Sequence, residues 1–187
     1  MEKYMAETEI IDWSDPALTC KALELSGGNR DPFRISQNCF EYVRDEILHS
    51  ADFRLNPVTC RASDVLKHGT GYCFAKSHLL AALLRANGIP AGLCYQRLAI
   101  SEGRYCLHGL NAVFLPECGW YRLDARGKKP GLIADFNPPE ERLPYAASGQ
   151  GEGLLPGIYG SPFESVVNVL ESCHSWEMVM MNLPDIA

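Results

Sequence analysis

The fold of this chain is decided by one stretch, Gly69-Thr70-Gly71-Tyr72-Cys73-Phe74-Ala75-Lys76, in which a glycine-containing turn becomes a long apolar helix at a cysteine. From Cys73 to Asn87 almost every residue is a helix former, and Gly88 followed by Pro90 predicts the helix end. Apolar residues occupy nearly every face, which indicates a central, buried helix. The backbone N–H groups of its first turn lack partners within the helix, so they stabilise a thiolate and can receive an oxyanion.

Two downstream residues complete a candidate nucleophilic site with this cysteine. His108 and Asp124 lie in two strand-like runs that residues 116–119 join, which predicts a hairpin. A base on one strand and an orienting carboxylate on the next, both facing a helix N-terminus, is the geometry that a Cys-His-Asp site requires. A free cysteine or a histidine alone is more often a packing residue, but the three together favour catalysis.

The register of the predicted hairpin must bring the histidine and the aspartate to one face. In an antiparallel pair, directly opposed residues share a face, so His108 and Asp124 share one only if paired residue numbers sum to an even value. A loop with an even number of residues gives an odd sum and separates the two side chains. We therefore predict a connection centred on Pro116 or Glu117, such as a three-residue loop with Gly119 at its exit, or a compensating bulge.

These features resemble the transglutaminase-like superfamily, whose papain-like core carries a Cys-His-Asp triad in this order. The resemblance covers roughly residues 55–130. It rests on Gly71-Tyr72-Cys73, the helix end at residues 84–91, the His108 strand, Leu115-Pro116, Gly119-Trp120 and Asp124. It implies an α+β fold in which a central buried helix packs against an antiparallel β-sheet with additional helices.

The chain departs from the family pattern at two places. The family commonly follows its histidine with Ala-Trp and its aspartate with Pro, whereas this chain has Gly109-Leu110 and Ala125-Arg126. These departures concern the substrate groove more than the triad.

The resemblance implies acyl transfer, in which the Cys73 thiolate attacks an amide carbonyl, His108 protonates the leaving amine and Asp124 orients the imidazole. The oxyanion would meet the Cys73 backbone N–H and one upstream donor, for which the Asn56 side chain and Tyr72 are the candidates. A small standalone, bacterial-type member most resembles a cysteine protease or amidase. The alternatives are a transglutaminase, an arylamine-type acyltransferase, and a binding module that keeps the triad without turnover.

Composition favours a single compact domain over residues 1–187, since 47% of the residues are hydrophobic and 21% are charged. The net charge of −6 argues against nucleic-acid binding. No secretory signal or membrane-length apolar run is visible, and eight scattered cysteines indicate reduced thiols in a cytoplasmic protein. The expected partner is a protein, peptide or small amide substrate, with the oligomeric state left open.

We expect no cofactor and no metal. Cys94, Cys106 and His108 could meet on adjacent strands, but the sequence has no C-x-x-C pair, and structural zinc sites normally collect their four ligands from such compact pairs.

The flanking segments supply supporting elements. A short strand is expected over Glu7 to Trp13, and Asp31-Pro32 opens an amphipathic helix with a surface His49 at its end. The glycine-rich stretch 148–157 is either a plain surface connection, which we favour, or a flap beside the site. Another helix is predicted after the capping-box residues Ser161 to Glu164.

Overall fold

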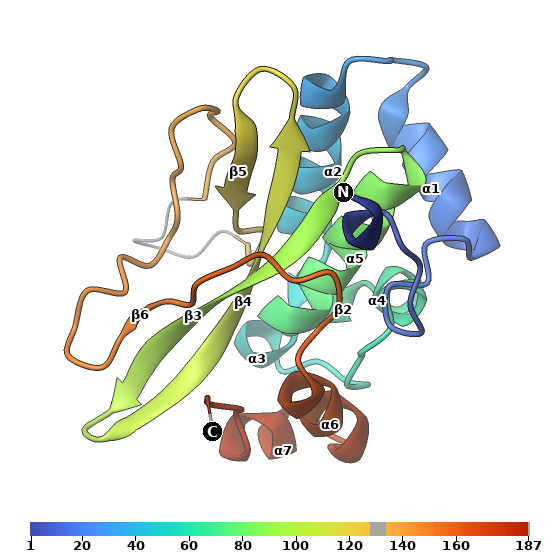
Figure 1. The fold of residues 1–187 in the computed structure, drawn as a ribbon. Coiled ribbons are helices and arrows are strands. Elements are labelled where there is room, and N and C mark those ends of the chain that lie inside the picture. Colours follow the sequence, from blue (N-terminus) through green and yellow to red (C-terminus); the bar gives the residue numbers. More distant parts are fainter. Residues whose placement is uncertain (128–133, 187) are drawn as a thin grey trace.

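A curled antiparallel sheet carries the main helices on one face (Figure 1). The computed structural model describes residues 1–127 and 134–186. Its strands follow the order β5-β4-β3-β6, and all three pairings are antiparallel. The predicted α+β class with an antiparallel sheet is therefore confirmed.

In chain order the elements are η1 (Glu2–Tyr4), α1 (Pro16–Ser26), α2 (Pro32–Glu46), β1 (Leu48–His49), α3 (Ser50–Phe53), α4 (Ala62–His68), β2 (Thr70–Gly71), α5 (Cys73–Ala86), β3 (Ala91–Ser101), β4 (Arg104–Leu115), β5 (Gly119–Leu123), β6 (Gly153–Leu154), α6 (Glu164–Ser172) and α7 (Trp176–Met181).

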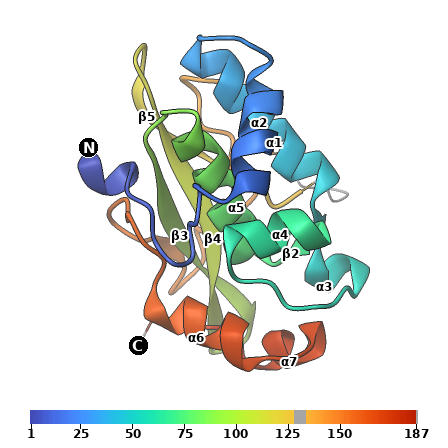
Figure 2. The same ribbon diagram turned by 90° about the vertical axis from the view of Figure 1, so that its right-hand side faces the viewer.

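Helix α5 is the centre of the molecule. All of its residues from Cys73 to Arg85 are buried. It packs against β3 and β4 on one side and against α1, α2 and α4 on the other, and Figure 2 shows it between these layers. A helix that is apolar all round needs such complete enclosure. The N-terminus of α5 is consequently held by the core and cannot shift without repacking it.

The β4–β5 hairpin has the predicted register. Asn111 pairs with Leu123 and Leu115 with Gly119, so the paired numbers sum to an even value throughout. The loop contains the three residues 116–118, and Gly119 at its exit has a φ of 76°, a left-handed conformation that glycine adopts without strain. Because Asp124 follows this register directly, parity places its side chain on the same face of the sheet as that of His108.

The prediction of a short N-terminal strand over Glu7 to Trp13 is wrong. Residues 7–13 form bends and a turn, in which the backbone N–H of Thr8 donates to the Ile11 carbonyl at 3.2 Å and the Ile11 N–H donates to Thr8 Oγ1 at 2.9 Å. Ile10 and Ile11 are nevertheless buried in the core. A threonine side chain that bonds to a nearby backbone group competes with strand pairing. Here Thr8 accepts the Ile11 N–H, and the segment forms a turn instead of a strand.

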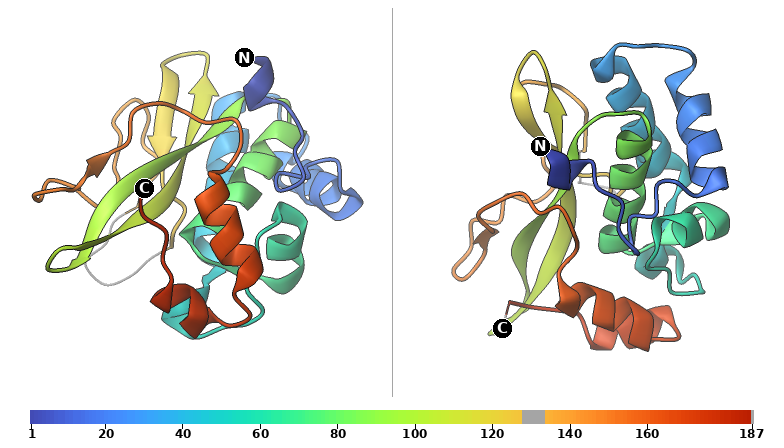
Figure 3. Two further views of the ribbon diagram at one scale, coloured as in Figure 1. Left: turned by 60° about the horizontal axis from the view of Figure 1, so that its bottom comes forward. Right: turned by 45° about the vertical axis from the view of Figure 1, so that its right-hand side comes forward.

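The C-terminal helices lie towards the end of the molecule at which β3 turns into β4 (Figure 3). Beyond α7, the carbonyl of Pro184 accepts a hydrogen bond from the Leu107 N–H at 2.7 Å. Asp185 pairs with Arg97 through two hydrogen bonds of 2.7 and 2.6 Å. Pro184 and Asp185 therefore hold the segment after α7 against β3 and β4. In the part of the chain that the structure describes, no helix is long and apolar enough to cross a bilayer.

Candidate active site

Cys73 occupies the first position of α5, and the preceding Tyr72 offers no side-chain cap to the helix. The cysteine is 7% exposed. Its Sγ accepts a hydrogen bond from the Gly109 N–H of β4 at 3.5 Å. The uncapped N–H groups of the first turn add a positive potential at the sulfur. A thiolate at this position is therefore stabilised from two elements at once.

Gly109 explains one departure from the family pattern. A Cβ atom at this position would lie 3.0 Å from Phe74 Cα and 3.3 Å from Phe74 N, closer than ordinary van der Waals contact. These two atoms are backbone, so they cannot rotate away as a flexible side chain would. Glycine lets β4 approach the start of α5 closely enough for its N–H to reach the Cys73 sulfur.

The structure brings the three predicted triad residues together. His108 Nε2 lies 2.6 Å from Asp124 Oδ2, and the two residues are 5% and 2% exposed. Asp124 Oδ1 accepts a second hydrogen bond, from the Arg126 backbone N–H at 2.8 Å. Both carboxylate oxygens are thus fixed. Because Nε2 is engaged by Asp124, Nδ1 is the ring nitrogen that remains for Cys73.

The electrostatics of the site favour a charged imidazole. Burial by itself lowers the pKa of His108. The negative charges of Asp124 and of a Cys73 thiolate, together with the hydrogen bonds to both residues, have a larger opposite effect and raise the pKa of His108 to about 10. At neutral pH the imidazolium therefore lies between a carboxylate and the sulfur. The His108 ring beside Cys73 can therefore donate a proton when it is charged and accept one when it is neutral.

The prediction of a surface His49 at the end of a helix is wrong, and the sequence interpretation missed His49 as a site residue. It is buried at 7% exposure, because the short parallel bridge between β1 and β2 pairs it with Gly71. Its ring lies edge-on to Tyr72 at 5.4 Å between centroids. Burial, with nearby positive charges, lowers the pKa of His49 to about 3, so the imidazole is neutral. Among the described residues its Nδ1 has no hydrogen-bond partner, and Asp52 lies 3.8 Å away.

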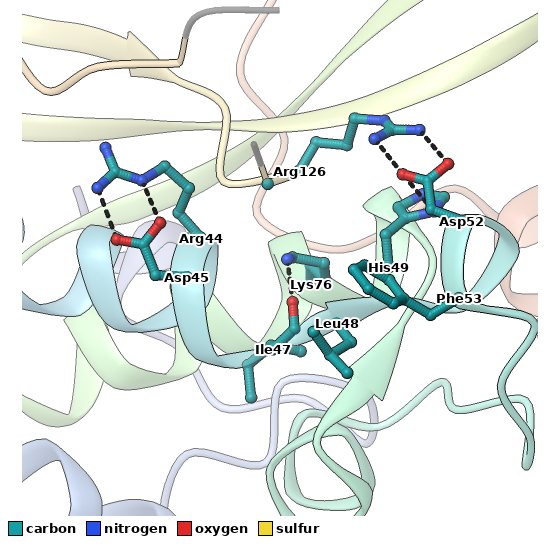
Figure 4. Close-up of a pocket in the computed structure, with 10 residues that line it drawn as sticks. Arg44, Asp45, Ile47, Leu48, His49, Asp52, Phe53, Lys76 and Arg126 are labelled. Atoms are coloured by element: carbon teal, nitrogen blue, oxygen red, sulfur yellow. Dashed lines mark hydrogen bonds and ion pairs between the residues drawn. The ribbon is translucent and has the colours of Figure 1, made fainter. Parts of the chain in front are cut away.

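A pocket of about 150 Å³ adjoins the cavity that Cys73 lines, and Figure 4 shows this pocket. Arg126 pairs there with the Asp52 carboxylate through hydrogen bonds of 2.5 and 3.0 Å. The buried amine of Lys76 donates to the Ile47 carbonyl, and burial lowers its pKa to about 7. Figure 4 shows the His49 side chain beside Asp52 and Arg126. His49 and Arg126 line this pocket and also the cavity at Cys73.

The cavity at Cys73 has a volume of about 220 Å³. His108 and Arg126 line it near the nucleophile, together with Tyr145, whose ring meets the His108 ring edge-on at 4.8 Å between centroids. Gln96, directly opposite His108 in the sheet, donates to the Tyr145 carbonyl at 3.0 Å. The stretch 137–152 is thereby tied to the sheet beside the site.

The two side chains predicted as oxyanion donors are engaged elsewhere. Asn56 Oδ1 accepts a hydrogen bond from the Trp176 N–H at 2.9 Å, and Asn56 does not line the cavity. Tyr72 lines the cavity, but its hydroxyl donates to the Trp176 carbonyl at 2.6 Å. The structure therefore places neither side chain as a donor to Cys73, because Asn56 lies outside the cavity and the Tyr72 hydroxyl already donates elsewhere. The Trp176 N–H lies at the start of α7, where it has no partner within the helix, and Asn56 satisfies it.

The residues considered as a rival metal site do not form one. Within the described ranges, no group of three or more His, Cys, Asp or Glu side chains is arranged to hold a metal ion. Cys94 packs in a small apolar cluster with Leu110 and Ala112. Cys106 instead lines the cavity beside His108.

Comparisons with known proteins agree with this geometry. The model of the family "Transglutaminase-like superfamily" matches residues 21–125, a range that contains all three triad residues. No curated protein matches the chain.

Two solved structures share the fold. One is a "Putative Cysteine Protease" from Cytophaga hutchinsonii, with 16% identity and a TM-score of 0.52 over 83% of this chain and 50% of that chain. The other is the periplasmic domain of TgpA from Pseudomonas aeruginosa bound to ethylmercury, with 20% identity and a TM-score of 0.50 over 65% and 46%. The chain thus corresponds to about half the length of each, and identities this low concern the fold alone.

Proposed function

Because this chain belongs to the transglutaminase-like superfamily, we propose that it is a cysteine enzyme that cleaves amide bonds through a thioester on Cys73. The observation that carries the proposal is the buried His108, held at 2.6 Å from Asp124 with its other ring nitrogen left for Cys73. A nucleophile, a base and an orienting group in contact are what acyl transfer by a thiol needs. The substrate would be a protein, a peptide or a small amide.

The reaction would proceed in two balanced halves. The Cys73 thiolate attacks the carbonyl carbon, and the tetrahedral intermediate collapses as His108 Nδ1 gives its proton to the amine nitrogen, so the C–N bond breaks and a thioester forms. The amine leaves. His108, now neutral, takes a proton from a water molecule that attacks the thioester, and the C–S bond breaks as the acid is released. Asp124 stabilises the imidazolium in both halves.

Hydrolysis of the thioester is the first of three proposals for the function of this site. In a transglutaminase or an arylamine-type acyltransferase, an amine would replace water in the second half. In a binding module the triad would hold its geometry without turnover, and no thioester would form.

We further propose a cytoplasmic location, which suits a chain whose eight cysteines are all free thiols.

Alkylation of the folded protein tests the nucleophile. We expect limiting iodoacetamide to modify Cys73 before the other thiols, although it is buried, because a paired thiolate reacts faster than a neutral thiol. Cys20 and Cys118 are exposed and serve as internal controls for simple access. Peptide mapping by mass spectrometry gives the order of modification. If either exposed cysteine reacts first while Cys73 stays unmodified, Cys73 is not an activated nucleophile.

We infer that His49 supplies the second oxyanion donor in place of Asn56 and Tyr72. It lines the same cavity as Cys73, and its neutral ring carries one N–H. The backbone N–H of Cys73 would be the first donor. A neutral imidazole polarises a carbonyl without surrendering its proton, since its own deprotonation is far outside the working pH.

Replacing His49 with alanine should lower kcat by about a hundredfold to a thousandfold with little change in KM, as loss of one oxyanion donor does. His49→Gln should restore part of the rate, because its amide also donates. Alkylation of Cys73 forms no oxyanion, so its rate should stay within about twofold of the wild type in both variants. An equal fall in alkylation and turnover would mean that His49 only supports the position of Cys73.

A further inference from the structure

The cavity beside the triad is polar at one end and apolar at the other. Its far part is lined by side chains from β3, β4, α7 and the segment after α7, namely Leu98, Ile100, Leu107, Met180 and Leu183. Among the described residues that line it, Arg126 is the one permanently charged side chain, and its guanidinium is paired with Asp52. The part of a ligand that extends beyond Cys73 therefore contacts apolar side chains.

The cavity volume fits a single apolar group. An apolar cavity of roughly 150 Å³ is large enough to hold benzene, and this cavity has about 220 Å³. It is smaller than the roughly 300–1,000 Å³ of sites that enclose drug-sized ligands. A ring or a branched aliphatic chain, with the two or three atoms that connect it to a carbonyl, matches this space.

The outer wall of the cavity is fixed by contacts away from the triad. The Leu107 N–H donates to the Pro184 carbonyl at 2.7 Å, which holds the backbone next to Leu183 against β4. Asp185 pairs with Arg97 through both carboxylate oxygens, and Arg97 lies over the Tyr105 ring at 3.9 Å from its centroid. The wall is therefore present before a substrate binds, so a ligand does not have to order it.

We propose that this cavity binds the acyl group of the substrate and selects uncharged, apolar acyl groups of about the size of a leucine or phenylalanine side chain. The inference rests on the proposed thioester chemistry. The acyl group stays on Cys73 through both halves of the reaction, whereas the amine must leave and water must enter. A cavity with an apolar wall suits the part that stays, and a charged acyl group would lose part of its hydration there without an unpaired opposite charge to bind it.

A series of acyl donors with one leaving group tests the inference. We would measure kcat/KM for the acetyl, 3-methylbutanoyl, 3-phenylpropanoyl and glutaryl amides of 7-amino-4-methylcoumarin, with mass detection of the Cys73 adduct. The 3-phenylpropanoyl amide should exceed the acetyl amide by at least about a hundredfold, because even one added methylene in an apolar pocket is worth roughly tenfold or more. The charged glutaryl amide should react no faster than the acetyl amide.

Two neighbouring methionines of α7 provide a matched pair of variants. Met180 lines the cavity and Met181 does not, while both are exposed to solvent on one side, at 44% and 68%. Met180→Glu should lower the ratio of kcat/KM for the 3-phenylpropanoyl amide to kcat/KM for the acetyl amide at least about tenfold. Met181→Glu should leave this ratio unchanged. Thermal unfolding of both variants checks that the fold is retained.

The possible outcomes separate the inference from the function on which it rests. Equal reaction of all four amides, preference for glutaryl, or equal effects of Met180→Glu and Met181→Glu would overturn the acyl subsite while acylation of Cys73 still stood. If no donor acylates Cys73, the proposed function and the subsite are both rejected.

Discussion

Replacing Cys73 with alanine is expected to abolish turnover while the protein stays folded. Loss of a catalytic nucleophile typically costs on the order of a millionfold in kcat, which leaves only the effects of binding and the oxyanion site. Alanine is a good helix former at the start of α5, and the substitution removes only the contacts of the sulfur with the Gly109 N–H and with His108. The measurement is amide hydrolysis with thermal unfolding of the same sample.

Cys60→Ala is the matched control. Cys60 is also 7% exposed and also a free thiol, but it does not line the cavity. Its replacement should leave kcat within about threefold of the wild type, since it removes packing without touching the site. Residual activity of Cys73→Ala above about one per cent would require another nucleophile, and the thioester mechanism would then be rejected.

The Cys73→Ala variant should also unfold differently with pH. His108 has a pKa of about 10 in the folded protein, above the 6.5 of a free histidine, so its charged form stabilises the fold fully below pH 6.5. That stabilisation is lost as the pH rises through about 10. The Cys73 thiolate is one of two charges that raise this pKa. Without it the loss should begin at lower pH.

The centre of the fold could be predicted because its signals are local. Helix α5 is a run of helix formers closed by Gly88, and the structure ends the helix at Ala86. The β4–β5 register followed from counting residues, because a three-residue loop with Gly119 at its exit was the arrangement that kept His108 and Asp124 on one face. Such local rules hold when turn chemistry and side-chain alternation agree.

The surroundings of the triad could not be predicted because distant segments build them. The bridge that buries His49 contains two residues in each strand, too few to leave a pattern. Tyr72 and Asn56 bond to Trp176, more than a hundred residues further along the chain. The cavity wall comes from α7 and from residues that no local signal connects to β4. Tertiary contacts of this kind override local propensity.

Asp124→Asn is expected to lower kcat by about ten-thousandfold, because the asparagine would present the wrong group to His108. Asp124 Oδ1 accepts the Arg126 backbone N–H, so the single amide oxygen of asparagine is drawn to that donor. The amide nitrogen then faces His108 Nε2 and donates to it. The ring proton moves to Nδ1, and a neutral imidazole with its proton there cannot accept the proton of Cys73.

The opposite orientation of the asparagine is also unfavourable. It would point the amide NH₂ at the Arg126 N–H and leave two buried donors facing each other. Loss of the carboxylate charge should at the same time lower the pKa of His108, which an NMR titration of the ring can follow beside kcat. Arg126→Ala is the comparison, since it keeps the backbone N–H and removes only the guanidinium, and its loss should be far smaller. Full activity in Asp124→Asn would mean that another group orients His108, and the triad would lose its third member.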